Sequence, residues 1–446
     1  RLPKVELGHT SAFRRRRFFN WFPVGLTYAF LYMGRYNLNA CIDRRDVLVL
    51  FDKAQYFEID SWGALTYGLS FLVNGPITDR IGGRKTTLIA AVGAAFANAL
   101  MGAVALWAMR DGAIPRDARP ALVPVFSALY ALNMYFQSFG AVSIVKVNSA
   151  WFHLRERGTF GGIFGILISL GLYFAFDWSS ALVKGVGAHA AFFVPAGILL
   201  VLAVVDLALV RDTPGEAGHT DFDLGDATGT GERMPLRRVV RLMLGSSAIL
   251  TIAAIEFCSG YLRNTIMKSY RSFSEDTGRA AVDYVQMHWG MMNCVAGILG
   301  GVLAGLISDR LFQSRRGPVA ALLYAAMIVG SLAMYATLRT PYVGWVLVLM
   351  TLAIIGVHGM LSGTASMDFG GKRNVGVVVG VIDGCVYLGS TLGSRVLKVV
   401  LPARPLSSTA AAWWTWPAAI LPFAVLGFVL TLFVWNAKPR TAAPAQ

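Results

Sequence analysis

Charged residues are scarce in this sequence. Asp, Glu, Lys and Arg make up 15% of its 446 residues, while hydrophobic residues make up 55% and aromatic residues 12%. A soluble domain has roughly 25% charged residues, so this chain lacks the polar side chains that would cover a water-exposed surface. The same proportions exclude intrinsic disorder, which requires low hydrophobicity. The composition therefore indicates a protein whose solvent is the lipid bilayer.

Cysteine is also rare, and the common catalytic motifs are missing. All four cysteines lie inside apolar stretches, without the spacing of metal ligands or of a disulfide framework. The sequence has no Gly-Lys-Ser/Thr phosphate loop and no paired-histidine metal motif. We therefore expect no enzymatic activity, no cofactor and no bound metal. The cysteines are Cys41, Cys258, Cys294 and Cys385.

Acidic residues are outnumbered by basic ones. The chain has 40 Lys and Arg against 25 Asp and Glu, which gives a net charge of +15. The basic residues lie between the apolar segments and are not gathered on one face, which argues against nucleic-acid binding and favours contact with membrane lipids. More of them fall on the side of the two termini than on the opposite side. We therefore expect a multi-pass protein of the cell (inner) membrane with both termini in the cytoplasm.

Long apolar segments fill most of the chain. A helix that crosses a bilayer needs about 20 mostly apolar residues, and the sequence has twelve such candidates. A polar, glycine-rich stretch separates them into two sets of six. We expect an N-terminal bundle over 1–210, a cytoplasmic linker over 211–239 and a C-terminal bundle over 240–446. The candidate spans are 18–42, 60–79, 86–109, 120–150, 158–181, 187–210, 240–268, 284–308, 317–338, 341–367, 374–400 and 411–437.

Two features recur at about half the length of the chain. Asp79-Arg80 follows the second span, and Asp309-Arg310 follows the eighth span 230 residues later. Arg35 in the first span and Arg263 in the seventh are separated by 228 residues. These repeats predict two homologous halves with a substrate site between them. The expected fold class is an all-α membrane protein with twelve transmembrane helices in two pseudo-symmetric six-helix bundles.

The first of these arginines lies in a polar helix face. A charge near the bilayer centre costs at least about 2.5–3.5 kcal/mol on insertion scales. Arg35 shares one helix face with Tyr28, Tyr32 and Asn39, at spacings of seven, three and four residues. With Arg263 as its counterpart, two guanidinium groups would face a central cavity and bind an anion. The planar fork of arginine suits phosphate especially well.

Acidic and histidine side chains within the spans leave alternatives open. Arg263 could instead pair with Glu256, seven residues before it, or extend toward the lipid headgroups. Glu256 and Asp383 are candidates for proton coupling, because a buried carboxylate can take up a proton, and they are also candidates for structural partners of arginine. His358 and His288 leave the same choice between the cavity wall and a bond to a neighbouring helix.

Several motifs resemble those of known transporters. Gly75-Pro-Ile-Thr-Asp79-Arg80, with its following basic cluster, resembles the inter-helix signature of the major facilitator superfamily. Tyr28-Ala-Phe-Leu-Tyr32-Met-Gly-Arg35 resembles the first span of organophosphate:phosphate antiporters, which include transporters of glycerol-3-phosphate and hexose-6-phosphate. Tyr67-Gly-x-Ser70, Phe136-Gln137-x-x-Gly140 and Tyr387-Leu-Gly-Ser390 extend the match. The resemblance covers the whole chain and implies the major facilitator fold.

The resemblance also implies roles for particular residues. Phe71 stands at the family's second-span lysine and Ile168 at its fifth-span histidine. These departures imply a larger or more apolar phosphorylated or carboxylated anion than glycerol-3-phosphate. The expected substrate-binding residues are Arg35, Arg263, Tyr28, Tyr32, Asn39, Tyr67 and Gln137. The expected gating residues are Asp79, Arg80, Arg84, Lys146, Asp309 and Arg310, of which Lys146 could instead contact substrate.

Three functions follow from these observations. The first is a monomeric secondary transporter that exchanges an organophosphate for inorganic phosphate by alternating access, since an empty, positively charged site would disfavour crossing without cargo. The second is a proton-coupled carrier of another organic anion or drug. The third is a membrane sensor of a phosphorylated metabolite, because some members of the antiporter family report external hexose phosphate to a kinase.

Overall fold

The computed structural model describes residues 9–436, except 45–46, 113, 116, 154–156, 223–240, 242–244 and 313–314. Side chains are described for these residues except at 157–164, 248, 309 and 362–379. Helices account for most of the described residues, so the predicted all-α class is confirmed. Most of the predicted linker, from residue 223 onward, lies outside the described residues.

The first half of the chain forms helices over all six predicted spans. The Thr10 side chain accepts a hydrogen bond from the Phe13 amide at the start of α1, and Asp52 and Gln55 form a capping box at the start of α2. The fifth span is continuous through α5, the π-helical turn η3 and α6. The elements are α1 (Ser11–Tyr36), η1 (Asn37–Cys41), α2 (Lys53–Ile81), α3 (Gly83–Ala108), α4 (Leu122–Ser149), α5 (Arg157–Tyr173), η3 (Phe174–Trp178), α6 (Ser179–Gly185) and α7 (Ala190–Leu209).

The second half also forms helices over its predicted spans. The Ser246 hydroxyl caps the first of these helices by accepting a hydrogen bond from the Ile249 amide. Two short helices follow it before the next long one begins. The elements are α9 (Ser247–Met267), α10 (Tyr270–Asp276), α11 (Tyr284–Met287), α12 (Trp289–Leu311), α13 (Arg316–Thr337), α14 (Val343–Val400) and α15 (Thr415–Phe433).

Helix α14 accounts for two predicted spans. A straight helix of its 58 residues would be about 87 Å long. Yet Gly344, near its start, packs against Tyr270, while Arg404, just after its end, binds Asp276 of the same short helix α10. Both ends of α14 therefore lie at one end of the molecule, and α14 folds back on itself to cross the bundle twice.

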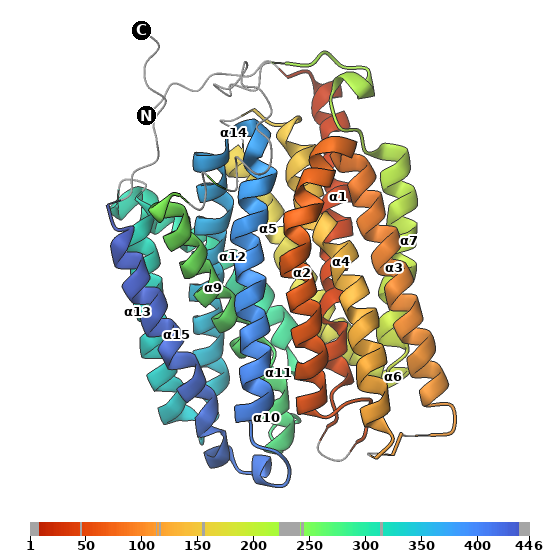
Figure 1. The fold of residues 1–446 in the computed structure, drawn as a ribbon, viewed down its shortest axis with the longest axis vertical. Coiled ribbons are helices and arrows are strands. Elements are labelled where there is room, and N and C mark those ends of the chain that lie inside the picture. Colours follow the sequence, from red (N-terminus) through yellow and green to blue (C-terminus); the bar gives the residue numbers. More distant parts are fainter. Residues whose placement is uncertain are drawn as a thin grey trace.

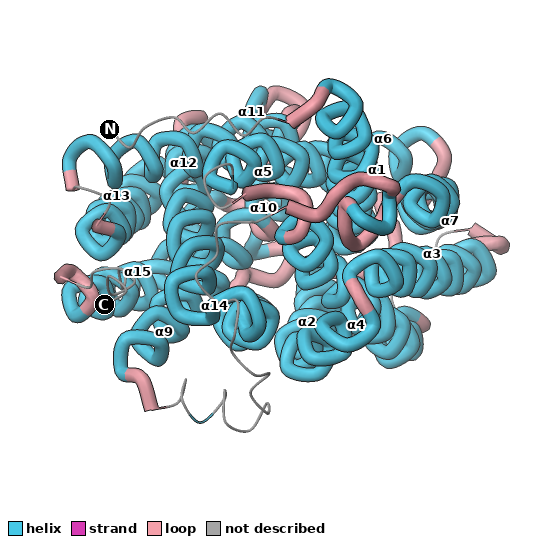
Figure 2. Tube along the Cα trace, turned by 90° about the horizontal axis from the view of Figure 1, so that it is seen from above, coloured by secondary structure: helices cyan, strands magenta, loops and turns pink. Residues whose placement is uncertain are grey.

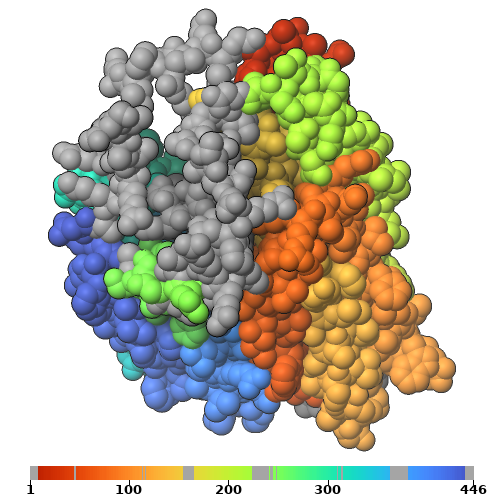
Figure 3. Space-filling view, turned by 45° about the horizontal axis from the view of Figure 1, so that its top comes forward, coloured from red at the N-terminus to blue at the C-terminus, as the bar shows by residue number. Residues whose placement is uncertain are grey.

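Viewed along the helices, the two halves of the chain lie side by side. Figure 2 shows α2, α3, α4 and α7 on one side and α9, α12, α13 and α15 on the other. In the space-filling view of Figure 3, the orange surface of α2 meets the light-blue surface of the later part of α14 along a seam. The helices α2 and α14 pack extensively there, and α5 packs on α12.

Glycine permits the close approach of α2 and α14. A Cβ atom on Gly68 would lie 2.9 Å from the Gly384 carbonyl oxygen, and a Cβ atom on Gly384 would lie 3.0 Å from the Gly68 carbonyl oxygen. Either side chain would push the two backbones apart. The two halves thus meet backbone to backbone at this crossing, next to Tyr387.

Eight helical stretches in the described part of the chain are long and apolar enough to cross a membrane. Helices α1, α2 and α9 are not among them, because they carry buried polar residues described below. In Figure 1 the start of α1 and the end of α7 lie toward the top, and α10 and α11 lie at the opposite end. We call these the terminal end and the distal end. Helix α1 runs from the terminal end to the distal end, where α2 begins.

Candidate functional site

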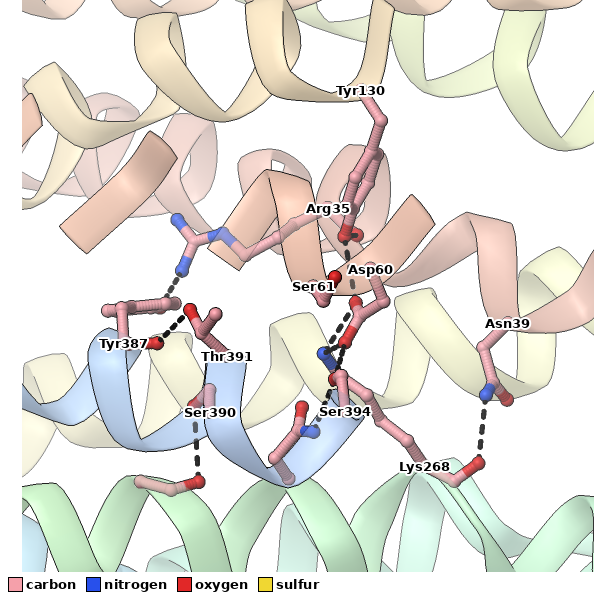
Figure 4. Close-up of polar contacts among 12 residues, drawn as sticks. Arg35, Asn39, Asp60, Ser61, Tyr130, Lys268, Tyr387, Ser390, Thr391 and Ser394 are labelled. Atoms are coloured by element: carbon pink, nitrogen blue, oxygen red, sulfur yellow. Dashed lines mark hydrogen bonds and ion pairs between the residues drawn. The ribbon is translucent and has the colours of Figure 1, made fainter. Parts of the chain in front are cut away.

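The guanidinium group of Arg35 lies at the seam between the two halves of the chain. Its side chain is fully buried. Its Nε donates a hydrogen bond to Gln137 Oε1 on α4 at 2.9 Å, and its Nη1 donates one to the Tyr387 hydroxyl on α14 at 2.7 Å. Figure 4 shows Arg35 reaching from α1 toward Tyr387. The contact with Tyr387 therefore joins the first half to the second.

Aromatic rings surround this guanidinium group. Its central carbon lies 4.6 Å from the ring centroids of both Tyr32 and Tyr67, and 5.8 Å from that of Tyr28. In the described part of the chain, Arg35 has no carboxylate partner, and its Nη2 is buried without a hydrogen bond. The Tyr67 hydroxyl is likewise buried without a partner. Neutral groups thus hold Arg35 in place and leave its charge uncompensated.

Arg263 approaches the same place from α9. Its guanidinium carbon lies 5.8 Å from the Tyr387 ring, and that of Arg35 lies 5.9 Å from the same ring. Among the described residues, Arg263 has no hydrogen bond or ion pair, so the alternative of pairing with Glu256 is not found. Both arginines line one pocket, together with Tyr36, Ala64, Met134, Asn264, Met267, Lys268, Tyr387 and Ser390.

Of the predicted binding residues, the structure brings Arg35, Tyr28, Tyr32, Tyr67 and Gln137 into one cluster, with Arg263 close by. Asn39 is an exception. It lies in the 3₁₀ segment η1 and donates a hydrogen bond to the Lys268 carbonyl oxygen at 3.1 Å. It therefore faces the distal side of the pocket and does not share the face of Arg35.

A buried ion pair closes the distal side of the pocket. Lys268 Nζ lies 2.7 Å from both carboxylate oxygens of Asp60 on α2, and both side chains are at most 7% exposed. The Ser394 hydroxyl on α14 donates to the same carboxylate at 2.5 Å, and the Tyr130 hydroxyl lies 3.4 Å from it (Figure 4). This network joins the two halves and was not predicted. The sequence signals for it are the opposite charges at the ends of spans 60–79 and 240–268, and the position of Lys268, which corresponds to an ionic cluster near the two arginines in the antiporters that the chain resembles.

Further contacts between the halves lie at the distal end. Lys53 pairs with Asp276, and Lys398 pairs with Glu58. The Asp177 carboxylate accepts hydrogen bonds from the Gly290 and Met291 amides at 2.7 and 2.9 Å, which caps α12. Apart from Arg35–Tyr387, all hydrogen bonds and ion pairs between the halves in the described part of the chain lie at this end. The structure is therefore closed there.

The predicted gating residues at the terminal end form contacts within the first half. Lys146 Nζ lies 2.8 Å from Asp79 Oδ1. Arg84 donates to the carbonyl oxygen of Leu207, and its amide donates to Asp212 at 2.7 Å. The described contacts of these residues do not cross the seam. Arg80 and Arg310 are exposed, and the side chain of Asp309 lies outside the described residues.

The predicted coupling residues separate into two places. Glu256 is fully buried, its Oε2 lies 2.9 Å from His358 Nδ1, and its Oε1 is buried without a hydrogen bond. Asp383 lies on α14, one helical turn before Tyr387. His288 does not lie within a span, because it is exposed at the distal start of α12 and contacts the Tyr284 carbonyl oxygen. His288 is therefore not among the residues that line the pocket of Arg35 and Arg263.

The chain is similar to known membrane proteins over most of its length. A family model described as Major Facilitator Superfamily matches residues 17–394. A probable hexose phosphate transport protein of Chlamydia trachomatis is 23% identical, over 98% of this chain and 94% of that protein. The glycerol-3-phosphate transporter of Bacillus subtilis is 22% identical, over 96% of this chain and 95% of that protein. The membrane sensor protein UhpC of Escherichia coli is 23% identical, over 85% and 84%.

The fold is also found among solved structures. A bacterial homologue of the human lysosomal transporter Spinster, in an inward-facing and unoccupied conformation, matches with a TM-score of 0.68 at 14% identity. The match covers 98% of this chain and all of that one. At this identity the similarity shows the shared fold, with the helices in the same arrangement.

Proposed function

The chain belongs to the Major Facilitator Superfamily, and on this premise we propose that it is a secondary transporter that exchanges an organophosphate for inorganic phosphate. The observation that carries the proposal is the pair Arg35 and Arg263, which line one pocket from opposite halves without a carboxylate partner among the described residues. The relatives named as hexose phosphate and glycerol-3-phosphate transporters support this substrate class.

The charge of the pocket matches a phosphate monoester. Among the residues that line the pocket and their ion-pair partners, Arg35, Arg263 and Lys268 supply three positive charges, and Asp60 supplies one negative charge. The remaining charge of about two units is balanced by a phosphate monoester, whose charge is roughly −1.5 to −2 at neutral pH. The free Arg35 Nη2 and the free Tyr67 hydroxyl are donors that such an anion can accept.

An aromatic residue beside the pocket supports an apolar body on the substrate. Phe71 is buried, and its ring lies 4.9 Å from that of Tyr67 and 6.2 Å from that of Tyr387. At this place the antiporters that the chain resembles carry a lysine. An aromatic ring adds apolar contact and no charge. We therefore propose a substrate with one phosphate group and an uncharged, partly apolar remainder.

Alternating access would follow from the division of the site between the halves. A phosphate group bound by Arg35 and Arg263 would draw the halves together, while the empty site keeps its uncompensated charges apart. The distal contacts would break as the halves rock and the terminal end closes. With both termini in the cytoplasm of a bacterial cell, the distal end would face outward. We propose that one chain, surrounded by membrane lipids, suffices for this cycle.

Counterflow in proteoliposomes tests the exchange. We expect uptake of a labelled organophosphate, or of labelled phosphate, only when phosphate is present inside the vesicles, because the empty site does not reorient. Vesicles without an internal anion are the control. Robust uptake into these empty vesicles would contradict obligatory exchange. Specific binding without any flux would instead favour a sensor, the role named for the UhpC relative.

One observation favours a second candidate function, a proton-coupled carrier. The buried carboxylate of Glu256 has one oxygen on His358 and one oxygen without a hydrogen bond, and the His358 side chain is 26% exposed. A proton can therefore reach the carboxylate through the histidine. The other titratable groups near Glu256 are Arg263 and Cys258 on α9, Cys385 on α14 and Tyr324 on α13.

Replacement of Glu256 by glutamine separates the two functions. If protons drive transport, we expect Glu256→Gln to abolish the stimulation of uptake by an inward pH gradient, because the amide cannot take up a proton, while exchange of labelled phosphate between equal pools continues. The measurement is uptake with and without the gradient, with Glu216→Gln, an exposed carboxylate at the terminal end, as the matched control. Uptake that never responds to the gradient in the unmodified protein would exclude this candidate.

A further inference from the structure

A second group of cations lies at the distal end, outside the central pocket. Arg271 is on α10, three residues beyond Lys268, and belongs to the second half of the chain. Arg44 follows η1, and Lys184 is on α6, so both belong to the first half. Electrostatic interactions connect all three side chains. The cluster therefore brings positive charge to the seam from both sides.

Among the described residues, the guanidinium groups of this cluster have no hydrogen-bond or ion-pair partner. Arg271 is only 6% exposed, and in the described part of the chain it has neither a hydrogen bond nor an ion pair. Its Nη2 is buried without an acceptor, and so are Nε and Nη2 of Arg44. A buried donor of a charged group that finds no acceptor lowers the stability of the folded chain. An anion that accepts from both groups would account for two such arginines that interact electrostatically.

The acidic side chains nearby are already engaged. Asp276 on α10 pairs with Lys53 and Arg404, and Asp43 beside Arg44 pairs with Arg119 at 2.5 Å. Asp177 caps α12. Among the described residues, Glu275 is the remaining acidic neighbour, and it forms no ion pair with either arginine. The cluster therefore keeps an excess of positive charge.

Burial also disfavours the charged form of the Arg271 side chain. Desolvation, with a further contribution from the charge of Arg44, lowers the pKa of Arg271 to about 10. The group is still protonated at neutral pH, so the charge persists in a place that disfavours it. An added oxyanion would relieve this cost.

We propose that Arg271 and Arg44, with Lys184 beside them, form a second oxyanion-binding site at the distal seam, which takes a phosphate group. The group can belong to a free phosphate or to the headgroup of a phospholipid. Because Arg44 and Arg271 come from different halves, the bound group holds the distal end closed. The site is separate from the Arg35–Arg263 pocket, and it does not depend on which substrate that pocket carries. By linkage, its occupation disfavours opening of the distal end.

Phosphate binding to a chain without the central pair tests the proposal. In the full chain carrying Arg35→Gln and Arg263→Gln, purified in detergent, we expect inorganic phosphate still to raise the thermal unfolding temperature. Adding Arg271→Gln should raise the apparent Kd for phosphate about tenfold or more, as loss of a forked charge-assisted contact implies. Arg110→Gln, at an exposed distal arginine, should leave the Kd unchanged. Arg271→Lys and Arg44→Gln repeat the test if Arg271→Gln does not fold.

A second arm distinguishes the source of the phosphate group. For the same variants, the thermal unfolding temperature is measured in nanodiscs of phosphatidylglycerol and in nanodiscs of digalactosyldiacylglycerol, which has no phosphate. Stabilisation that depends on Arg271 and occurs only with phosphatidylglycerol supports the site with a lipid as its ligand. Stabilisation by inorganic phosphate in detergent supports a soluble ligand. If neither phosphate source stabilises the chain in an Arg271-dependent manner, the proposal is wrong, whatever the central pocket does.

Discussion

Replacement of Arg35 by lysine is expected to lower the rate of anion exchange about 100-fold, although the positive charge is kept. The guanidinium group uses Nε for Gln137 and Nη1 for Tyr387, and it has Nη2 left for an anion. The compact ammonium group of lysine cannot donate hydrogen bonds to Gln137, Tyr387 and an anion at the same time. Each charge-assisted hydrogen bond contributes about 1.5–3 kcal/mol, and each 1.36 kcal/mol is a factor of ten in rate, so one or two lost bonds account for this decrease.

The measurement for Arg35→Lys is counterflow of labelled phosphate in proteoliposomes, at equal protein content. Thermal unfolding of the purified variant shows whether it is folded. The control is Arg110→Lys, because the Arg110 side chain is 65% exposed and pairs only with the neighbouring Asp111 in the described part of the chain. An Arg35→Lys variant that exchanges phosphate as fast as the unmodified protein would remove Arg35 from the proposed site.

The second large effect is expected at Asp60. Asp60→Asn leaves Lys268 buried without its carboxylate, and breaking a buried ion pair in this way costs about 3–5 kcal/mol. Because the pair forms only where the halves meet, this cost falls on the distally closed conformation. The equilibrium should move toward distal opening by about a hundredfold to several thousandfold, since 1.36 kcal/mol is a factor of ten.

Cys41 reports on distal opening, because it is fully buried at that end. In a chain whose other three cysteines are replaced by serine, we expect Asp60→Asn to raise the rate of Cys41 alkylation by a membrane-impermeant maleimide at least about tenfold. This increase is smaller than the shift of the opening equilibrium expected from loss of the buried ion pair. Glu58→Gln breaks the half-exposed pair with Lys398 and should change alkylation less than about twofold.

A double variant identifies the cause of this effect. Asp60→Asn combined with Lys268→Met removes both charges of the pair, and replacing a buried ion pair by apolar groups is often neutral. Slow alkylation of Cys41 should therefore return. If Asp60→Asn alone leaves alkylation unchanged, the pair does not hold the distal end closed.

The sequence predicts residues that share one helix better than residues that meet across helices. Tyr28, Tyr32 and Arg35 were placed together by helical spacing, and the structure places them together. Asn39 was assigned to the same face by an α-helical spacing of four residues. The helix changes to 3₁₀ geometry at Asn37, with three residues per turn, so Asn39 turns toward Lys268 instead.

Residue spacing along the sequence does not predict the contacts between the two halves. Asp60 and Lys268 are 208 residues apart, and Arg35 and Tyr387 are 352 residues apart. Periodicity fixes the face of each helix, but the partner on that face depends on how the two bundles pack. The resemblance to the antiporter family identifies Tyr387 as part of a motif, but it does not predict that Tyr387 lies between the two arginines. The eight described stretches that are long and apolar enough to cross a membrane, by contrast, follow from length and hydropathy alone.

The contact of Gly68 with Gly384 has a mechanical consequence. Interlocked side chains would resist rotation of one helix on the other, whereas two bare backbones form a smooth surface on which α2 and α14 can roll. This crossing lies beside Tyr387, at the level of the arginines. It can therefore act as the fulcrum of the rocking motion that we propose. A small tilt about this point moves both ends of the molecule in opposite directions while the spacing of the two guanidinium groups hardly changes.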